Sequence, residues 1–185
     1  RRKINSPVQH SMKEFIEQLC NDLESADHPL IKLLDKIRLH AALNTFSQVI
    51  LKVCCPGVPD FYQGTEAFDL SLVDPDNRRP VNYSHLATEM RKNRRARGAV
   101  QPEEYPEDSA KIALVRDLLQ IRKKYRAIFE KGDYIPVETT GKYRDHALAF
   151  LRQMGGDWIL VAIPLGTGYL IGAEQELINF DWEDT

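Results

Sequence analysis

The chain has 185 residues, of which 43% are hydrophobic and 28% charged, an ordinary balance for a protein that buries a core. Its formal net charge of −2 gives no general attraction to nucleic acid or acidic lipid, so neither is expected as a partner. No stretch approaches the ~20 apolar residues that a membrane helix needs, and the charged start at Arg1 lacks the apolar region of a signal peptide. Because the first residue is not Met, we expect a piece of a longer protein.

The N-terminal third is predicted to be helical. Ser6-Pro7 supplies a capping hydroxyl and a proline for the start of a first helix, which runs to about residue 24. Apolar residues at helical spacing then predict a second helix opening at residues 27–29 and a third over residues 46–54. Three successive helices with short connections indicate a packed helical layer.

The cysteines favour a reducing compartment. Cys20, Cys54 and Cys55 show no C-x-x-C spacing. Cys20 and Cys54 fall on apolar helical faces, so we predict that both are small core residues. This usage predicts a cytoplasmic protein.

The helical run ends at Pro56-Gly57. The next residues, Val58 to Tyr62, are β-branched and aromatic, and we predict a buried strand there. Residues 63–66 read as a loop at the C-terminal end of that strand, and residues 67–82 continue as a loop rich in Asp, Pro, Asn and Arg. A loop of this length in a compact domain is often functional.

The rest of the chain changes from helix to strand. Helices are predicted over residues 83–95 and 110–131, and Gly132 ends the second. The basic run 91–97 is interpreted as a solvated helix end, offset by nearby acidic residues such as Asp108. After Gly132, alternating patterns predict strands over residues 134–139, 147–153 and 158–163, with turns at Gly141 and Gly155-Gly156. Residues 166–185 have weak strand character.

Residues 60–79 concentrate the polar side chains that sugar recognition needs. Carboxylates and amides accept paired hydrogen bonds from neighbouring hydroxyls, and aromatic rings pack on the apolar face of a pyranose. A loop held together by Asp–Arg pairs is the competing interpretation. The run Asp74-Pro75-Asp76-Asn77 suggests a calcium loop, but Arg78 occupies the next ligand position, so no metal or cofactor is expected. Asp60 and Glu66 could form a glycosidase acid and nucleophile pair, although nothing requires it.

The order of these residues is more specific than their composition. Residues 56–66 read Pro-Gly-Val-Pro-Asp-Phe-Tyr-Gln-Gly-Thr-Glu, which resembles the eighth-strand segment of α-amylase-superfamily barrels (glycoside hydrolase family 13), typically P-G-[VI]-P-x-x-Y-x-G-x-E. The continuation over residues 69–81, together with residues 44–48 and 132–134, resembles the maltooligosyltrehalose synthase family in particular. The resemblance extends to about residue 165. The chain departs from it at Ala67-Phe68, where the family has a bulky residue and Trp, and Phe68 is expected to replace that aromatic.

The resemblance implies a fold and a domain organisation. The expected fold is α+β or partial α/β: a mostly helical N-terminal part from the end of a TIM barrel, followed by an incomplete C-terminal antiparallel β domain. Residues 1–55 would be a helical insert and a barrel helix, residues 56–131 the last barrel strand, active-site loop and closing helices, and residues 132–185 the β domain. Because most of the barrel is missing, the strand 58–62 would have open edges, which self-association could cover.

The resemblance also implies an activity. Members of the family convert the reducing-end α-1,4 bond of a maltooligosaccharide into an α,α-1,1 bond by an intramolecular transglucosylation of the retaining type. Their nucleophile Asp, acid/base Glu and assisting Asp lie upstream of the matched segment, so we expect no catalytic residue in this chain and no activity from it alone. The residues expected to bind the maltooligosaccharide or organise the loop are Asp60, Tyr62, Gln63, Glu66, Asp76 and Arg79.

Two other functions stay open at this point. One is a non-catalytic carbohydrate-binding module. The other is part of a hydrolase of the same superfamily, which shares the eighth-strand pattern.

Overall fold

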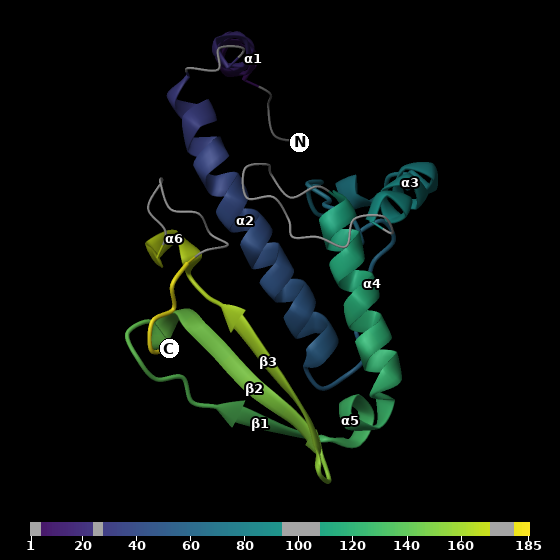
Figure 1. Ribbon diagram of the computed structural model, residues 1–185. Coiled ribbons are helices and arrows are strands. Elements are labelled where there is room, and N and C mark those ends of the chain that lie inside the picture. Colours follow the sequence, from purple (N-terminus) through teal and green to yellow (C-terminus); the bar gives the residue numbers. More distant parts are fainter. Residues whose placement is uncertain (1–4, 24–27, 94–107, 171–179) are drawn as a thin grey trace. The chain divides into compact units, whose positions relative to one another are not determined.

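The computed structural model describes residues 5–23, 28–93, 108–170 and 180–185. The chain divides into two compact units, residues 1–39 and 40–185. Helices occupy most of the described N-terminal half, and a three-stranded antiparallel sheet follows (Figure 1). This confirms the coarse prediction of a helical part followed by an antiparallel β part. The domain boundaries predicted after residues 55 and 131 stay predictions.

The first helix, α1, runs over Ser6–Asp22 and confirms the predicted element. Its cap is Asn5 and not Ser6, because the Asn5 side chain accepts a hydrogen bond from the Val8 amide at 3.5 Å. No residue of α1 is buried, and four side chains of its apolar face are more than half exposed: Val8, Met12, Phe15 and Ile16. The prediction that Cys20 is a core residue is therefore wrong, because the face that carries it is uncovered.

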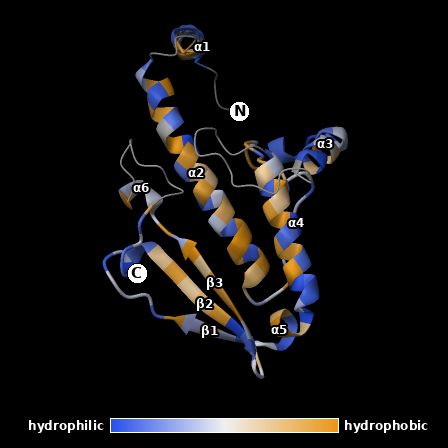
Figure 2. Cartoon of the chain, viewed as in Figure 1, coloured by the Kyte–Doolittle hydropathy of each residue, from blue (hydrophilic) through white to orange (hydrophobic). Residues whose placement is uncertain are grey.

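The second helix, α2, is a single element over Pro29–Cys54. Two helices were predicted over these residues, and that prediction was wrong. Neither Gly nor Pro occurs between Leu30 and Cys54, so nothing in the sequence interrupts the backbone hydrogen bonds. Figure 2 shows hydrophobic residues recurring along α2, whereas the shorter α3 (Tyr83–Asn93) is mostly hydrophilic.

The predicted strand at residues 58–62 does not form. This segment is irregular, and Val58 is 93% exposed. A strand requires a neighbouring backbone to complete its hydrogen bonds, and no other segment of the described residues pairs with this one. The α4 and α5 helices (Asp108–Lys124 and Arg126–Lys131) replace the single helix predicted over residues 110–131. The chain turns at Tyr125, which allows both Ile128 and Phe129 to be buried.

The sheet confirms the three predicted strands. β1 (Asp133–Val137), β2 (Ala147–Met154) and β3 (Asp157–Pro164) pair antiparallel in the order β1-β2-β3 (Figure 1). The β2–β3 hairpin turns at Gly155 and Gly156, as predicted, and Gly155 has a φ of +61°. The short helix α6 (Thr167–Leu170) follows where weak strand character was predicted, and residues 171–179 lie outside the described residues.

One core joins the sheet to the helices of the second unit. Cys54 at the end of α2, Phe129 of α5, Phe150 of β2 and Val161 of β3 are buried against one another. The core burial of Cys54 was predicted, and its environment raises the thiol pKa to about 11, chiefly through burial and then through the charge of Cys55.

Beside this core lies a buried cation, Arg152 of β2, which is 2% exposed. Its guanidinium donates to five main-chain carbonyl oxygens at 2.9–3.3 Å: those of Cys54, Ile128, Phe129, Gly132 and Asp133. These carbonyls include the C-terminal ends of α2 and α5, where a positive charge is favoured by the helix dipole. Among the described residues, no helix has the length and apolar content required to cross a membrane.

Candidate functional site

The segment that leaves α2 is anchored by Arg122 of α4. Its guanidinium donates to the carbonyl oxygen of Val53 at 2.5 Å and also to that of Gly57. Gly57 has a φ of +115°, a conformation that glycine adopts without strain. The start of the loop that follows is thus fixed at the end of α2.

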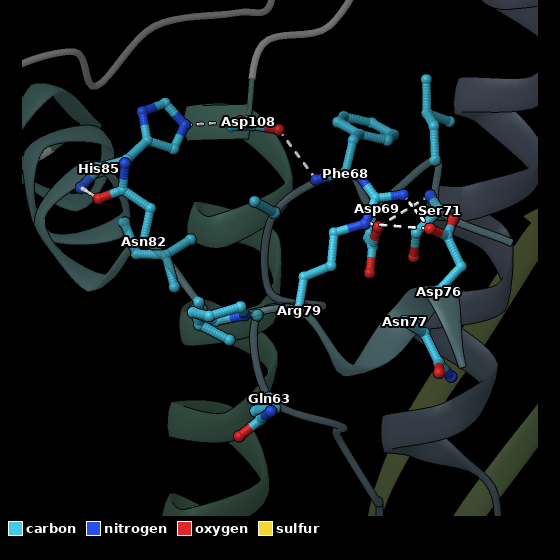
Figure 3. Close-up of a pocket in the computed structure, with 16 residues that line it drawn as sticks. Gln63, Phe68, Asp69, Ser71, Asp76, Asn77, Arg79, Asn82, His85 and Asp108 are labelled. Atoms are coloured by element: carbon cyan, nitrogen blue, oxygen red, sulfur yellow. Dashed lines mark hydrogen bonds and ion pairs between the residues drawn. The ribbon is translucent and has the colours of Figure 1, made fainter. Parts of the chain in front are cut away.

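A pocket of about 460 Å³ lies beyond this anchor (Figure 3). Its walls come from the loop predicted to be functional and from the N-terminal ends of α3 and α4. The lining residues are 63–64, 67–71, 76–77, 79–82, 85–86 and 108.

The structure separates the six predicted site residues into two groups. Gln63, Asp76 and Arg79 line the pocket. Asp60 and Tyr62 are exposed and do not line it. Glu66 also lies outside the lining and is half-buried.

Acid–arginine pairs hold the loop together, as the competing interpretation predicted. The Arg79 Nε donates to Asp76 Oδ1 at 3.0 Å, and Asp76 Oδ2 accepts the Leu72 amide at 2.7 Å. The hydrogen bond from Arg79, followed by that from Leu72, lowers the pKa of Asp76. Asp74 accepts from Arg78 Nε at 3.1 Å. Asp76 and Arg79 therefore shape the pocket wall by binding each other.

Asp69 is a further acidic group of the pocket. Its Oδ1 accepts the Ser71 amide at 2.9 Å. Hydrogen bonds from Ser71 lower the pKa of Asp69, so this carboxylate stays ionised over the whole neutral range. It gives the pocket a fixed negative charge beside the Asp76–Arg79 pair.

Two buried side-chain oxygens have no hydrogen-bond partner within the described part of the chain. They are Oε2 of Glu66 and Oδ1 of Asn77, and Asn77 lines the pocket. A buried acceptor without a donor is costly, so each oxygen lacks a hydrogen bond that a donor group or a water molecule would supply.

The polar group on the opposite wall of the pocket was not predicted from the sequence. His85 Nε2 lies 2.8 Å from Asp108 Oδ2, and Asp108 Oδ1 accepts the Phe68 amide at 2.9 Å. Asn82 caps α3 by accepting the His85 amide at 3.0 Å. An Asn before a helix is a recognisable cap, but no sequence signal joins His85 to Asp108, which are 23 residues apart.

Phe68 rests on a buried amine. Lys111 Nζ lies 5.3 Å from the centre of the Phe68 ring and donates to the Ala67 carbonyl oxygen at 2.7 Å. Burial, and then the nearby charge of Lys52, lowers the pKa of Lys111. Phe46 of α2 lies 5.9 Å from Phe68, ring centre to ring centre. These contacts fix the aromatic ring that was expected to replace the family's Trp.

The pocket has the donors and acceptors of a site for uncharged polar molecules. Three carboxylates and one guanidinium line it, together with the amides of Gln63, Asn77 and Asn82. Across the described residues, no three His, Cys, Asp or Glu side chains come close enough together to hold a metal ion.

The chain resembles one segment of proteins that are much longer than itself. No protein-family model matches it. Two Mycobacterium tuberculosis proteins, from strains CDC 1551 and H37Rv, are each 38% identical to it over 138 residues. The match covers 75% of this chain but 16% of each relative, so the chain spans about a sixth of the length of the curated relatives it matches.

The relatives share one name. Both M. tuberculosis proteins carry the provisional name maltooligosyl trehalose synthase. The solved Arthrobacter ramosus maltooligosyltrehalose synthase is 32% identical, with a TM-score of 0.60 over 77% of this chain and 18% of its own. A solved Sulfolobus tokodaii protein described as a hypothetical maltooligosyl trehalose synthase is 28% identical, with a TM-score of 0.61 over 89% of this chain and 21% of its own.

These comparisons confirm the family resemblance predicted from the sequence. The helices and the antiparallel sheet match the C-terminal part of the solved synthases.

Proposed function

We propose that this chain is the C-terminal part of a (1→4)-α-D-glucan 1-α-D-glucosylmutase. The parent enzyme would convert the reducing-end α-1,4 bond of a maltooligosaccharide into an α,α-1,1 bond by intramolecular transglucosylation. The observation that carries the proposal is that the loop with the family's residue order folds into a 460 Å³ pocket lined by Gln63, Asp76 and Arg79. The similarity to maltooligosyl trehalose synthases over 75% of the chain supports it.

The chemistry of the pocket suits a neutral sugar. Its three carboxylates, with Arg79 as the only guanidinium among the lining residues, leave an excess of negative charge that repels an anionic substrate such as a sugar phosphate. The amides of Gln63 and Asn77 can donate to and accept from hydroxyls, and the ring of Phe68 offers an apolar surface. The pocket would hold part of the maltooligosaccharide chain without taking part in bond cleavage.

In this proposal the bond-breaking residues belong to another part of the parent enzyme. A retaining mechanism needs a nucleophilic carboxylate and a carboxylic acid about 5 Å apart on the two sides of the scissile bond. The pocket carboxylates Asp76 and Asp108 are instead hydrogen-bonded within the pocket walls. In the parent TIM barrel the irregular segment 58–62 would pair with neighbouring strands and become the eighth strand.

The parent enzyme would work in the cytoplasm. Cys20, Cys54 and Cys55 are all free thiols, and a reducing compartment keeps them so. Outside the parent enzyme, the chain would cover the unpaired segment 58–62 by self-association, and light scattering of the purified chain would measure this.

Two measurements on the native gene product test the proposed function: its mass, and the products that it forms from maltopentaose. The mass of the native gene product should exceed that of the 21.2 kDa chain several-fold. That product, incubated with maltopentaose, should remove reducing ends without changing the mass of the sugar, and NMR should show a new α,α-1,1 linkage. An increase in reducing ends would instead identify a hydrolase of the same superfamily. Saturable maltopentaose binding by the 185-residue chain, with no reaction by the gene product, would identify a binding module.

A further inference from the structure

Asp108 joins two walls of the pocket that are far apart in the sequence. It is the first residue of α4, and both of its carboxylate oxygens have partners (Figure 3). Oδ1 accepts the main-chain amide of Phe68, 40 residues away, at 2.9 Å. Oδ2 binds the His85 ring of α3, 23 residues away, at 2.8 Å.

The geometry fixes the direction of both hydrogen bonds. A carboxylate oxygen only accepts, so His85 Nε2 carries the hydrogen and donates it to Asp108. The other ring nitrogen, Nδ1, lies 4.0 Å from Glu89 Oε1, beyond a direct hydrogen bond. Glu89 is buried and forms a 2.8 Å ion pair with Lys92. The His85 ring is thus oriented by Asp108 and by no other direct contact that the described residues make with its nitrogens.

Both partners of Asp108 face the pocket. Phe68, His85 and Asp108 all line it, although the side chain of His85 remains 46% exposed. Apart from this hydrogen bond, the hydrophilic helix α3 holds His85 through the Asn82 cap at 3.0 Å. Loss of the Asp108 carboxylate would therefore free the ring of His85 and leave the Phe68 amide without its acceptor.

We propose that Asp108 is a positioning residue that holds His85 and Phe68 in the pocket wall that binds one glucose unit of the maltooligosaccharide. This inference rests on the proposed function of the pocket. His85 would present its ring edge to the sugar, Phe68 would offer its ring face, and Asp108 would act through both.

The variants Asp108→Asn, His85→Phe and the double variant test this inference in the full gene product. An asparagine at 108 keeps an oxygen for the Phe68 amide but places an NH₂ group where Oδ2 accepted from His85. A phenylalanine at 85 keeps the ring and removes its nitrogens. Asp117→Asn is the control, since Asp117 lies on the same helix, pairs with Arg116 at 2.7 Å and does not line the pocket.

Each single variant should raise KM for maltopentaose about five- to tenfold, as expected for the loss of one oriented hydrogen bond, with kcat within about twofold. The double variant should be no worse than the single ones, because each removes the hydrogen bond that His85 donates to Asp108. Asp117→Asn should match the wild type, and thermal unfolding should show all four variants folded. If Asp108→Asn fails to fold, His85→Phe still tests the inference, because His85 is half-exposed and its replacement should not unfold the protein.

An unchanged KM in either folded single variant, additive effects in the double variant, or a loss confined to kcat would overturn the positioning role. A wild-type gene product that leaves maltopentaose unchanged would overturn the proposed function itself. The two failures are therefore distinguishable in one set of assays.

Discussion

The surroundings of Arg152 and the wall of the pocket both use arginine, but in opposite ways. Arg152 is buried and donates hydrogen bonds to five main-chain carbonyls, which connects helix ends to the sheet. Arg79 is 68% exposed and binds the side chain of Asp76, three residues away. The first arrangement connects distant segments, whereas the second stabilises a local turn. The free energy of unfolding should therefore depend on Arg152, and the shape of the pocket on Arg79.

Replacing Arg152 by Met should produce the largest loss of stability. Several buried carbonyl oxygens would lose their donor, and each unsatisfied group costs about 1–3 kcal/mol. We expect the free energy of unfolding in urea to fall by more than about 3 kcal/mol. The control Arg126→Met removes an arginine that is 76% exposed and should cost less than about 0.5 kcal/mol. If both variants lost the same free energy of unfolding, the burial of Arg152 would not explain its contribution to stability.

Gly132→Ala should have the next largest effect. An added Cβ would lie 2.4 Å from the Ile128 carbonyl oxygen and 2.7 Å from that of Gln153, both of them main-chain atoms. We expect a loss of about 1–3 kcal/mol in the same urea titration, as for other overpacked sites. Gly156→Ala is the matched control, because an added Cβ there meets no atom within 4 Å. If the two alanines were equally tolerated, the turn before β1 would not be as crowded as described.

Two carboxylates of the pocket, those of Asp69 and Asp76, should titrate at unusually low pH. Hydrogen bonds lower the pKa of Asp69 and of Asp76, so their contribution to loop stability is complete above the unfolded value of about 3.9. That contribution disappears only as the pH falls through the folded pKa values. Carbon-13 NMR of these two carboxyl groups should give midpoints below ~3.9.

The variant Arg79→Met separates the two carboxylates. The pKa of Asp76 should move up toward its usual value, because Arg79 supplies the largest part of its shift. Asp69 should keep most of its shift, which comes from Ser71. If the titration midpoints of Asp69 and Asp76 moved equally, the two carboxylates would not owe their shifts to separate local partners.

Thiol labelling should distinguish Cys20 from Cys54 by their reaction rates, with no change in stability. Cys20 is exposed, whereas Cys54 is buried and its pKa is raised to about 11. Iodoacetamide at pH 8 should modify Cys20 at least about a hundredfold faster, because Cys54 is buried and its raised pKa disfavours the reactive thiolate. Peptide mass mapping would measure both rates, and urea should make them converge. Rapid labelling of Cys54 in the folded chain would place it outside the core.

Local pattern in the sequence predicted the strands well, because they pair with near neighbours in the chain. The bounds of the three strands after Gly132 were predicted to within two residues, because the β2–β3 hairpin and β1 pair with one another within 32 consecutive residues, 133–164. The segment 58–62 was mispredicted because its β-branched composition says nothing about whether a partner strand is present. Cys20 was mispredicted for a related reason. An apolar helical face can pack against another element, but the sequence does not show whether such an element is present.

The candidate site was predictable only where it is local. Gln63, Asp76 and Arg79 belong to one loop whose residue order is distinctive, and all three line the pocket. His85 and Asp108 come from two helices joined through residues 94–107, which lie outside the described residues. Their 2.8 Å contact depends on how α3 packs on α4, which a single sequence does not reveal.

The hydrogen bonds of Arg152 also bear on how this part of the chain folds. Its acceptors come from residue 54 and from residues 128–133, while the cation itself sits on β2. Burying a guanidinium lowers the free energy only when enough hydrogen-bond acceptors surround it. In a hairpin formed alone, Arg152 would therefore stay hydrated. Desolvation of the cation thereby links the hairpin and both helix ends into one cooperative step, and they should melt together in a single transition.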